Sequence, residues 1–470
     1  MAIFYRDGEE KIRPGVYQRH TNVDKYVVAG ARDGICAIPI KASWGPLGVV
    51  VKNTKASNLT KTYGTGAYGE GYTVPAAAAM FDGGASIVYT YRMGAGGKKA
   101  SKTLDGVTVT AKHEGTLPIS VAVQAKLGDN TKKQFLVYVN NSLVESWEFA
   151  ADGTAEGENL IKAAAKSKYV DITGTATEVS VLAVASGALS GGENPTVTNA
   201  DYSAAFGALE PYYYNTIALD VDDDENMTLS LMLQEYLDNA YEMGKLGMAV
   251  VGEKTAVAFE DRLAHAAAFD DAKVVYLGGG WKRGTVDMDG VMAICYTAGL
   301  IAATPANKGI THTVIEGATD LCESLLYSDY EEAILHGMLM VSMSPDGEIW
   351  YDSGVNTLIN PEENQDNGWK KIRRVKTRFE MIDRLDRELT PKVGRVSCDS
   401  DGVADVIQTG QRVLDAMANN EGKIFPGATF TEDPDNPYQG DSAWFIIRAD
   451  DIDSLEKIYL QYQFRYSQLS

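Results

Sequence analysis

A run of acidic residues and a run of basic residues are the side chains of this sequence best suited to chemistry. The acidic run comprises Asp220 and Asp222-Asp223-Asp224-Glu225, and several carboxylates at one place can bind a divalent cation. An EF-hand loop also requires a glycine and a distal glutamate at fixed offsets, and both are missing. Because the run precedes a segment with helical apolar spacing at 227–247, we interpret it as a helix start, where carboxylates complement the helix dipole.

The basic run places six cations within nine residues of a chain whose formal net charge is −21. It consists of Lys370, Lys371, Arg373, Arg374, Lys376 and Arg378. One interpretation is a solvated helix face, and the other is a docking patch for an acidic neighbouring subunit. Direct contact with nucleic acid is disfavoured, because an acidic protein repels phosphate groups.

Recognisable catalytic and cofactor motifs are absent. The sequence has no phosphate-binding loop, no dinucleotide-binding glycine motif, no HExxH and no GxSxG. None of the five histidines has a partner at metal-binding spacing, and His265 is expected to be a surface or hydrogen-bonded core residue. The four cysteines show no CxxC spacing. We therefore expect no catalytic residue, no metal site and no cofactor, and we expect that the protein is not an enzyme.

The pattern of apolar residues and turns divides the 470 residues into five parts. Residues 1–22 are expected to form an extended N-terminal arm, and residues 23–92 mix strands with a short alanine-rich helix. Short β-branched runs separated by turns make residues 93–200 typical of a β-sandwich. Strands alternate with helices through residues 201–360, which predicts a parallel sheet covered by helices. Residues 361–470 predict an α+β module.

Individual elements follow from the same spacing. Strands are expected over residues 26–29, 35–40, 104–112, 177–184, 248–251 and 338–343, and helices over residues 75–81, 227–247 and 288–304. Two amphipathic helices are expected in the last module, one over 372–389 and one near 401–419. The apolar stretch 291–305 is too short to span a bilayer, and the charged residues 1–11 do not resemble a signal peptide. Neither a membrane anchor nor an export signal is expected.

The two chain ends carry the most informative pattern. Residues 457–466 alternate strictly, and the following share one face: Ile458, Leu460, Tyr462, Phe464 and Tyr466. Proteins normally blunt such an exposed strand edge with Lys or Pro, so we expect it to be covered, either within its own sheet or by pairing with another chain. The N-terminal arm could pair in the same way through Phe4, Tyr5, Ile12, Val16 and Tyr17. Two such arms on one subunit would give heterologous contacts, which propagate as rings or open helices.

Several motifs resemble those of phage tail sheath proteins and occur in the same order. Arg13-Pro14-Gly15-Val16-Tyr17 resembles the PGVY opening of that family, and Trp44-Gly45-Pro46-Leu47-Gly48 resembles its W-GP-G segment. Residues 109–121 are similar to the start of its β-sandwich, although Leu117-Pro118 replaces a Gly-Asn pair, and residues 371–375 resemble the opening of its C-terminal domain. In length and style the chain is most similar to sheaths of PBSX-like and diffocin-like contractile tails, the latter being R-type bacteriocins.

The resemblance implies a multidomain α/β plus β fold. Residues 23–92 and 201–360 would form a subtilisin-like α/β sheath core without a working triad, residues 93–200 an inserted β-sandwich, and residues 361–470 a tube-facing C-terminal domain ending in an exchange strand. Subunits would stack as hexameric rings around a tail tube and contract to drive the tube through the target cell envelope. The two arms would join sheets of neighbouring C-terminal domains. The helix at 401–419 would touch the tube through Asp405, Gln408, Arg412 and Asp415.

The resemblance also implies the partners and the location. The chain would bind copies of itself in a helical homopolymer, the tail tube protein, and baseplate and tail-terminator proteins, with no direct nucleic acid or membrane partner. It would assemble in the bacterial cytoplasm and end in a phage tail or, after lysis, in an extracellular bacteriocin particle. Two alternatives stay open: an α/β hydrolase-like enzyme with a decorating β-domain, and a monomeric surface or capsid-decoration protein with self-satisfied termini.

Overall fold

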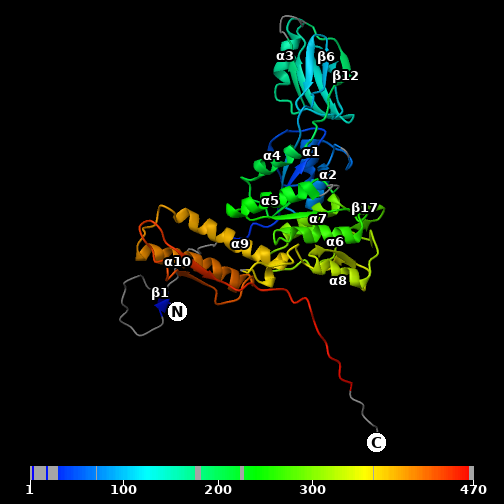
Figure 1. The fold of residues 1–470 in the computed structure, drawn as a ribbon. Helices are drawn as coiled ribbons and strands as arrows, with labels where there is room; N and C mark the ends of the chain where they lie inside the picture. Colours follow the sequence, from blue (N-terminus) through cyan, green and yellow to red (C-terminus); the bar gives the residue numbers. More distant parts are fainter. Residues whose placement is uncertain are drawn as a thin grey trace.

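The computed structural model describes residues 3–4, 17–18, 30–69, 71–174, 181–222, 227–363 and 365–464. Three parts follow one another along the molecule: a β-rich module at one end, an α/β body, and a helical C-terminal module (Figure 1). Short strands β1 (Ile3–Phe4) and β2 (Tyr17–Gln18) pair in parallel. The expected strand at 26–29 and the arm residues Tyr5, Ile12, Val16 and Tyr466 lie outside the described residues.

A seven-stranded sheet forms the centre of the α/β body. Its strands run in the order β19 (Met338–Leu339), β15 (Val274–Leu277), β14 (Met248–Gly252), β13 (Thr216–Ala218), β3 (Ile35–Ile40), β5 (Ile87–Arg92) and β4 (Val50–Asn53). All neighbours pair in parallel except the edge strand β4, which is antiparallel to β5. The central strands are apolar throughout and buried, as expected for a sheet covered on both faces.

Helices cover both faces of this sheet. One apolar core contains side chains of α1 (Ala56–Tyr63), α2 (Val74–Asp82) and α7 (Val291–Ala303). The core on the other face contains side chains of α4 (Asn199–Leu209), α5 (Thr228–Glu242), α6 (Phe259–Phe269) and α8 (Tyr327–Leu335). Gly299 brings α7 against α2, because a Cβ there would lie 2.0 Å from the carbonyl oxygen of Met80.

Several smaller elements flank the sheet. They are β16 (Trp281–Arg283), β17 (Val286–Met288) and β18 (Asp320–Leu321), which form one sheet, and the antiparallel pair β20 (Val341–Met343) and β21 (Ile349–Tyr351). The single strand expected over 338–343 is therefore two strands. Met338 and Leu339 pair with β15, whereas Val341 to Met343 turn away to pair with β21. Within the described residues, no helix combines the length and apolarity needed to cross a membrane.

The β-rich module contains two antiparallel sheets around one apolar core. Three strands are ordered β11 (Val170–Thr173), β7 (Val107–Ala111) and β6 (Ser101–Leu104), and four are ordered β10 (Ser142–Ala150), β9 (Lys132–Val139), β8 (Ile119–Ala125) and β12 (Ala185–Ala188). The strand expected over 104–112 is confirmed only for residues 107–111, because Asp105 and Gly106 adopt positive φ and form a tight hairpin between β6 and β7. Helix α3 (Glu156–Ala163) packs on β10. The first half of the strand expected over 177–184 falls outside the described residues, and residues 181–184 form no strand.

The side chain of Trp44 joins the β-rich module to the body. It leaves the loop after β3 and is buried in the core of the module, stacked on Tyr169 and edge-on to His113. Burial, together with the charge of Arg92, lowers the pKa of His113 to about 4, so the ring against Trp44 is neutral. The buried Arg92 donates hydrogen bonds to the carbonyls of Ala42 at 3.0 Å, Gly45 at 2.7 Å and Glu114 at 2.9 Å. The W-GP-G segment is therefore a joint between two cores.

The C-terminal module is built on two helices, α9 (Ile372–Leu389) and α10 (Ser400–Asp415), followed by a π-helical turn at Ala416–Asn420. Helix α9 belongs to two cores at once. Ile372, Val375 and Phe379 in its first half pack in the core of the body, and Leu385 in its second half packs against α10. Strands β22 (Thr429–Glu432) and β23 (Phe445–Arg448) form a two-stranded sheet on α10. Short 3-10 turns lie at Asn367–Lys370 and Thr390–Lys392.

The buried side chain of Lys376 fastens α9 to the end of α7. Its ammonium group donates hydrogen bonds to the carbonyls of Ile301 and Thr304, where a helix leaves its last carbonyls without backbone partners. Burial lowers the pKa of Lys376 to about 8, although Asp33 and Glu380 act in the opposite direction.

We expect W44A to loosen the β-rich module. Removal of a buried tryptophan costs about 3–5 kcal/mol, so the midpoint temperature of unfolding measured by calorimetry should fall. Trypsin should also cleave W44A faster than the wild type at Lys98 and Lys99 beside the joint. W444A is the matched control, because Trp444 is 46% exposed and its loss should change little. Equal protease resistance of W44A and the wild type would contradict the joint.

Lys376 should also make stability depend on pH. Between about pH 8 and pH 10.5 the unfolded chain binds this proton more tightly than the folded chain, so the free energy of unfolding should rise with pH. The gain amounts to about 2 kcal/mol by pH 10, and K376M should lack it. Calorimetry of both proteins across this range measures the difference, with K245M as an exposed-lysine control. Parallel pH profiles for wild type and K376M would contradict the assignment.

Candidate assembly surface

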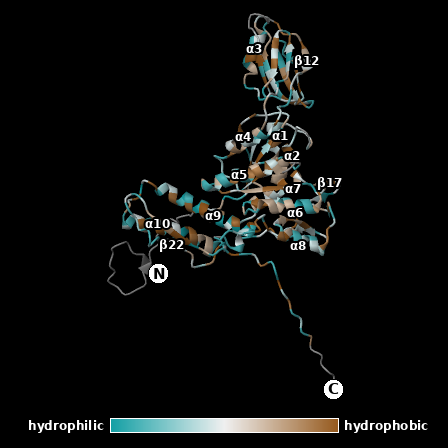
Figure 2. Ribbon diagram, viewed as in Figure 1, coloured by the Kyte–Doolittle hydropathy of each residue, from teal (hydrophilic) through white to brown (hydrophobic). Residues whose placement is uncertain are grey.

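The C-terminal segment leaves the body after Glu456. Residues 457–464 form no strand within the described part of the chain, and Figures 1 and 2 show the segment extending away from the rest of the molecule. Its apolar side chains remain in solvent, with exposures between 69% at Leu460 and 93% at Phe464. Such exposure forgoes the stabilisation that apolar burial provides, roughly 25 cal/mol per Å². The alternative of cover by the chain's own sheet therefore does not apply to residues 458–464.

The sheet on the C-terminal module is narrow. Strands β22 and β23 pair only with each other in the described residues, with Phe430 opposite Ile447 and Thr431 opposite Ile446. The ring of Phe430 lies on Gly410 of α10, whose Cβ, if present, would approach the ring within 2.4 Å. Ile447 lies on the same face as Phe430, yet it is 41% exposed. Isolated two-stranded sheets are marginally stable and carry unpaired edge groups.

The basic run lies along the first half of α9 and faces acidic residues of its own chain. Arg374 contacts Asp451 at 2.6 Å, and Arg378 contacts Asp366 at 2.8 Å and Asp451 at 3.3 Å. Lys371 pairs with Glu456, and Arg373 donates to the hydroxyl of Ser454 at 2.8 Å. Lys370 donates to the carbonyl of Ile359 at 2.6 Å, and Lys376 is buried as described above. These contacts pair the cations with groups of their own chain, and a role of the basic run as a docking patch stays a prediction.

Asp451 is the most enclosed carboxylate of this group. Burial acts to raise its pKa, but hydrogen bonds and charge from Arg374 and Arg378 outweigh burial, and the pKa lies below its usual range. The hydrogen bonds to Asp451 raise the pKa of Arg374 in turn. Both groups are therefore charged at neutral pH, and their pairing weakens only when acid protonates Asp451.

The four polar residues named for α10 share one side of that helix. Gln408, Arg412 and Asp415 are exposed, and Asp405 is half-buried beside Lys392 at 2.6 Å. The side chain of Asp415 accepts a hydrogen bond from Gln411 at 2.9 Å. The opposite side of α10 is buried through Val413 and Leu414. The structure thus brings Asp405, Gln408, Arg412 and Asp415 together on a solvent-facing stripe.

The acidic run does not cap α5 where the structure describes it. Asp222 instead accepts a hydrogen bond from the backbone N–H of Val291 at 3.0 Å, at the start of α7, and pairs with Lys254 at 3.2 Å. Asp220 is buried and accepts hydrogen bonds from Thr73 and Tyr202, both at 2.6 Å, and burial raises its pKa. For Asp220 and Asp222 the interpretation is therefore wrong, because Asp222 lies at the start of α7 and Asp220 is bonded to other side chains. Asp223, Asp224 and Glu225 lie outside the described residues.

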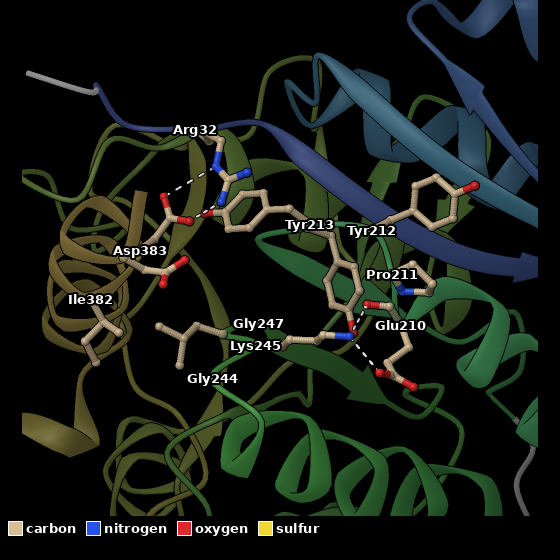
Figure 3. A pocket seen from close by; sticks show the side chains of 13 residues that line it. Arg32, Glu210, Pro211, Tyr212, Tyr213, Gly244, Lys245, Gly247, Ile382 and Asp383 are labelled. Atoms are coloured by element: carbon tan, nitrogen blue, oxygen red, sulfur yellow. Dashed lines mark hydrogen bonds and ion pairs between the residues drawn. The ribbon is translucent and has the colours of Figure 1, made fainter. Parts of the chain in front are cut away.

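A cavity of about 320 Å³ lies where α9 meets the body (Figure 3). Two ion pairs lie in its lining, Arg32 with Asp383 and Lys245 with Glu210 at 2.6 Å, and Asp386 accepts a hydrogen bond from the hydroxyl of Thr390 at 2.9 Å. The guanidinium of Arg32 also lies 3.5 Å from the centre of the Tyr213 ring. The lining contains no serine, cysteine or histidine, so the cavity lacks the Ser–His and Cys–His pairs of nucleophile and base.

Comparison with known proteins agrees with the resemblance seen in the sequence. Residues 195–357 match the family described as the phage tail sheath protein central domain. The chain is 25% identical to the Bacillus subtilis protein YqbK over 89% of this chain and 90% of YqbK. It is 23% identical to the phage-like element PBSX protein XkdK of Bacillus subtilis, over 82% of this chain and 80% of XkdK.

A solved structure shares the fold as well. The sheath tail protein Lin1278 of Listeria innocua superposes with a TM-score of 0.71 at 20% identity, covering 90% of this chain and 96% of that protein. The chain thus carries the central domain of phage tail sheath proteins on a mixed α/β multidomain fold similar to a sheath structure.

We expect G410A to destabilise the C-terminal module, since the added methyl overlaps the Phe430 ring. Overpacking of this kind costs about 1–3 kcal/mol. G207A is the matched control: Gly207 lies in α4 with no atom within 4 Å of the new Cβ, and the change should stabilise by about 0.5–1 kcal/mol. Thermal unfolding of both variants measures the opposite signs, and equal effects would disprove the packing of β22 on α10.

Proposed function

We propose that this chain is a structural subunit of a contractile tail sheath, which polymerises as hexameric rings around a tail tube and contracts to drive the tube through a cell envelope. One observation carries the proposal. The chain holds an extended C-terminal segment whose alternating apolar side chains lie in solvent, and it also holds a two-stranded sheet too narrow to be stable alone. The segment extends away from the rest of its own subunit (Figure 1), so it could add a strand to the sheet of another subunit.

Strand exchange would proceed by backbone pairing along an open edge of the β22–β23 sheet. Residues 457–464 can span roughly 26 Å when extended, which is far enough to reach an adjoining subunit. Ile458, Leu460, Tyr462, Phe464 and Tyr466 would bury their side chains over the helix beneath the sheet. The N-terminal arm would supply a second strand through Phe4, Tyr5, Ile12, Val16 and Tyr17. Two donor strands per subunit give heterologous contacts that propagate without closing on a dimer.

The remaining parts take their roles from this arrangement. The proposed division is an arm at 1–22, a subtilisin-like core at 23–92 and 201–360, an inserted β-sandwich at 93–200 on the outside, and a tube-facing domain at 361–470. The stripe of Asp405, Gln408, Arg412 and Asp415 on α10 would contact the tail tube protein. Baseplate and tail-terminator proteins would close the two ends of the polymer. Assembly would take place in the bacterial cytoplasm, and the product would be a phage tail or a released bacteriocin-like particle.

Contraction requires no catalytic residue in this proposal. Two packings of the same subunits need only differ in free energy, and a trigger releases the less stable one. A difference of about 1 kcal/mol per subunit between the two packings, summed over many subunits, gives a large total. That total exceeds the free energy of unfolding of one protein, which is only about 5–15 kcal/mol.

Deletion of residues 458–470 should abolish polymerisation and leave the monomer folded. The deletion removes the donor strand but none of the core residues. Negative-stain electron microscopy measures the polymer, and circular dichroism measures the fold. The paired variants L460S/Y462S and Q461S/Q463S sharpen the test, because only the first pair changes the apolar face. Tubes or rings formed equally by the truncated chain and the full chain would refute strand exchange.

A further inference from the structure

The salt bridges on α9 hold one short segment in place. We call residues 451–456, together with their partners on α9, the arm anchor. Asp451 lies between Arg374 and Arg378, which are one helical turn apart, and Glu456 accepts from Lys371 and from the hydroxyl of Thr311 at 3.0 Å. The backbone adds two hydrogen bonds, from Phe425 to Asp450 at 2.8 Å and from Ile452 to Lys423 at 3.0 Å. Side chains and backbone thus grip the same segment.

The helix side of the anchor is fixed to the body. Ile372 and Val375 are buried in the body core, and Lys376 is bonded to the end of α7. Thr377 donates to the carbonyl of Ala306 at 3.1 Å, in the loop that follows α7. The cations that hold the acidic segment therefore stand on the most firmly packed part of the C-terminal module. A force applied to the chain at residue 456 would therefore act on α9 through these ion pairs, and from α9 on the α/β body.

The grip ends abruptly. Glu456 is the last residue whose side chain is held: it is 20% exposed, whereas Leu455 before it points into solvent at 82% exposure and Ile458 after it is 70% exposed. Half-buried, charge-assisted hydrogen bonds are stronger than exposed ion pairs, so the transition from held to free chain falls at a defined point. A chain restrained at its root samples a smaller volume than one that is free from β23 onward, and its effective concentration at a neighbouring site is higher.

We propose that the arm anchor is a positioning device: Lys371, Arg374 and Arg378 fix the point and direction in which the C-terminal strand leaves the subunit, and they transmit load from that strand to the body. This inference rests on the proposed strand exchange. It assigns the basic run a role within the subunit, where the sequence suggested either a solvated surface or a docking patch. Its residues position the strand and need make no contact with the neighbouring subunit.

The test compares R374Q/R378Q with K98Q/K245Q, which removes the same charge from two exposed ion pairs that include no residue of 451–456. Hydrogen exchange of the backbone amides of residues 450–456 is measured on monomers, and the threshold concentration for polymerisation is measured by sedimentation and microscopy. We expect amide exchange in R374Q/R378Q to accelerate at least about tenfold, and the threshold concentration to rise severalfold. The control should match the wild type in both measurements.

Two further variants separate positioning from general stability. R374K/R378K keeps the charge but loses the paired hydrogen bonds, so its threshold should lie between those of the wild type and the glutamine variant. D453N/S454A removes only partly exposed anchor contacts, so it should fold normally and still raise the threshold. Unchanged amide exchange or an unchanged threshold in the glutamine variant would overturn the anchor. A wild-type chain that never polymerises would instead refute the proposed function.

Discussion

Helix α9 offers one apolar stripe, and that stripe is divided between two hydrophobic cores. Ile372, Val375 and Phe379 complete the core of the body, and Leu385 completes the core beneath the two-stranded sheet. A straight helix cannot satisfy both cores unless they keep a fixed mutual orientation. Ion pairs between α9 and the chain after α10 also fix this mutual orientation: Arg384 pairs with Glu421 at 2.6 Å, and Lys423 pairs with Glu380 at 2.6 Å. Breaking such pairs strands a buried charge, so the joint is stiff.

Stiffness at α9 leaves motion to the parts that are not packed. The body, the C-terminal module and the root of the strand form one continuous set of contacts, whereas residues 457–464 have no such support. Elements with few buried contacts open and rearrange first. The net charge also limits how subunits associate. A chain of net charge −21 repels its copies, so association must come from short-range strand pairing and apolar burial, which act only after two subunits meet in the right orientation.

Local patterns predicted what local physics decides. The apolar runs at 35–40 and 248–252 are strands, and the stripe from Ile372 to Leu389 is a helix, because burial on one or two faces dictates their spacing. The hairpin at Asp105-Gly106 was missed because the two-residue turn was taken as part of a strand. The helix at 199–209 was missed because the glycine- and serine-rich segment before it indicated a linker. Partners far along the chain carried no local signal: Asp451 meets Arg374 across 77 residues, and Asp222 meets Val291 across 69. The exposure of residues 458–464 fits the sequence pattern, because alternation that nothing in the chain covers predicts apolar side chains in solvent.

The way in which the chain enters and leaves the β-rich module has a practical consequence. The two crossing segments run side by side and pair through their backbones, Ala95 with Thr196 and Lys98 with Glu193. The chain therefore enters the β-rich module from β5 and returns from it to α4 at nearly the same place, and no strand of the module belongs to the body sheet. The β-rich module can therefore be replaced by a foreign domain whose two ends lie close together, provided that an apolar side chain of the new domain covers Trp44. The crossing is a natural grafting position for displaying cargo on this scaffold.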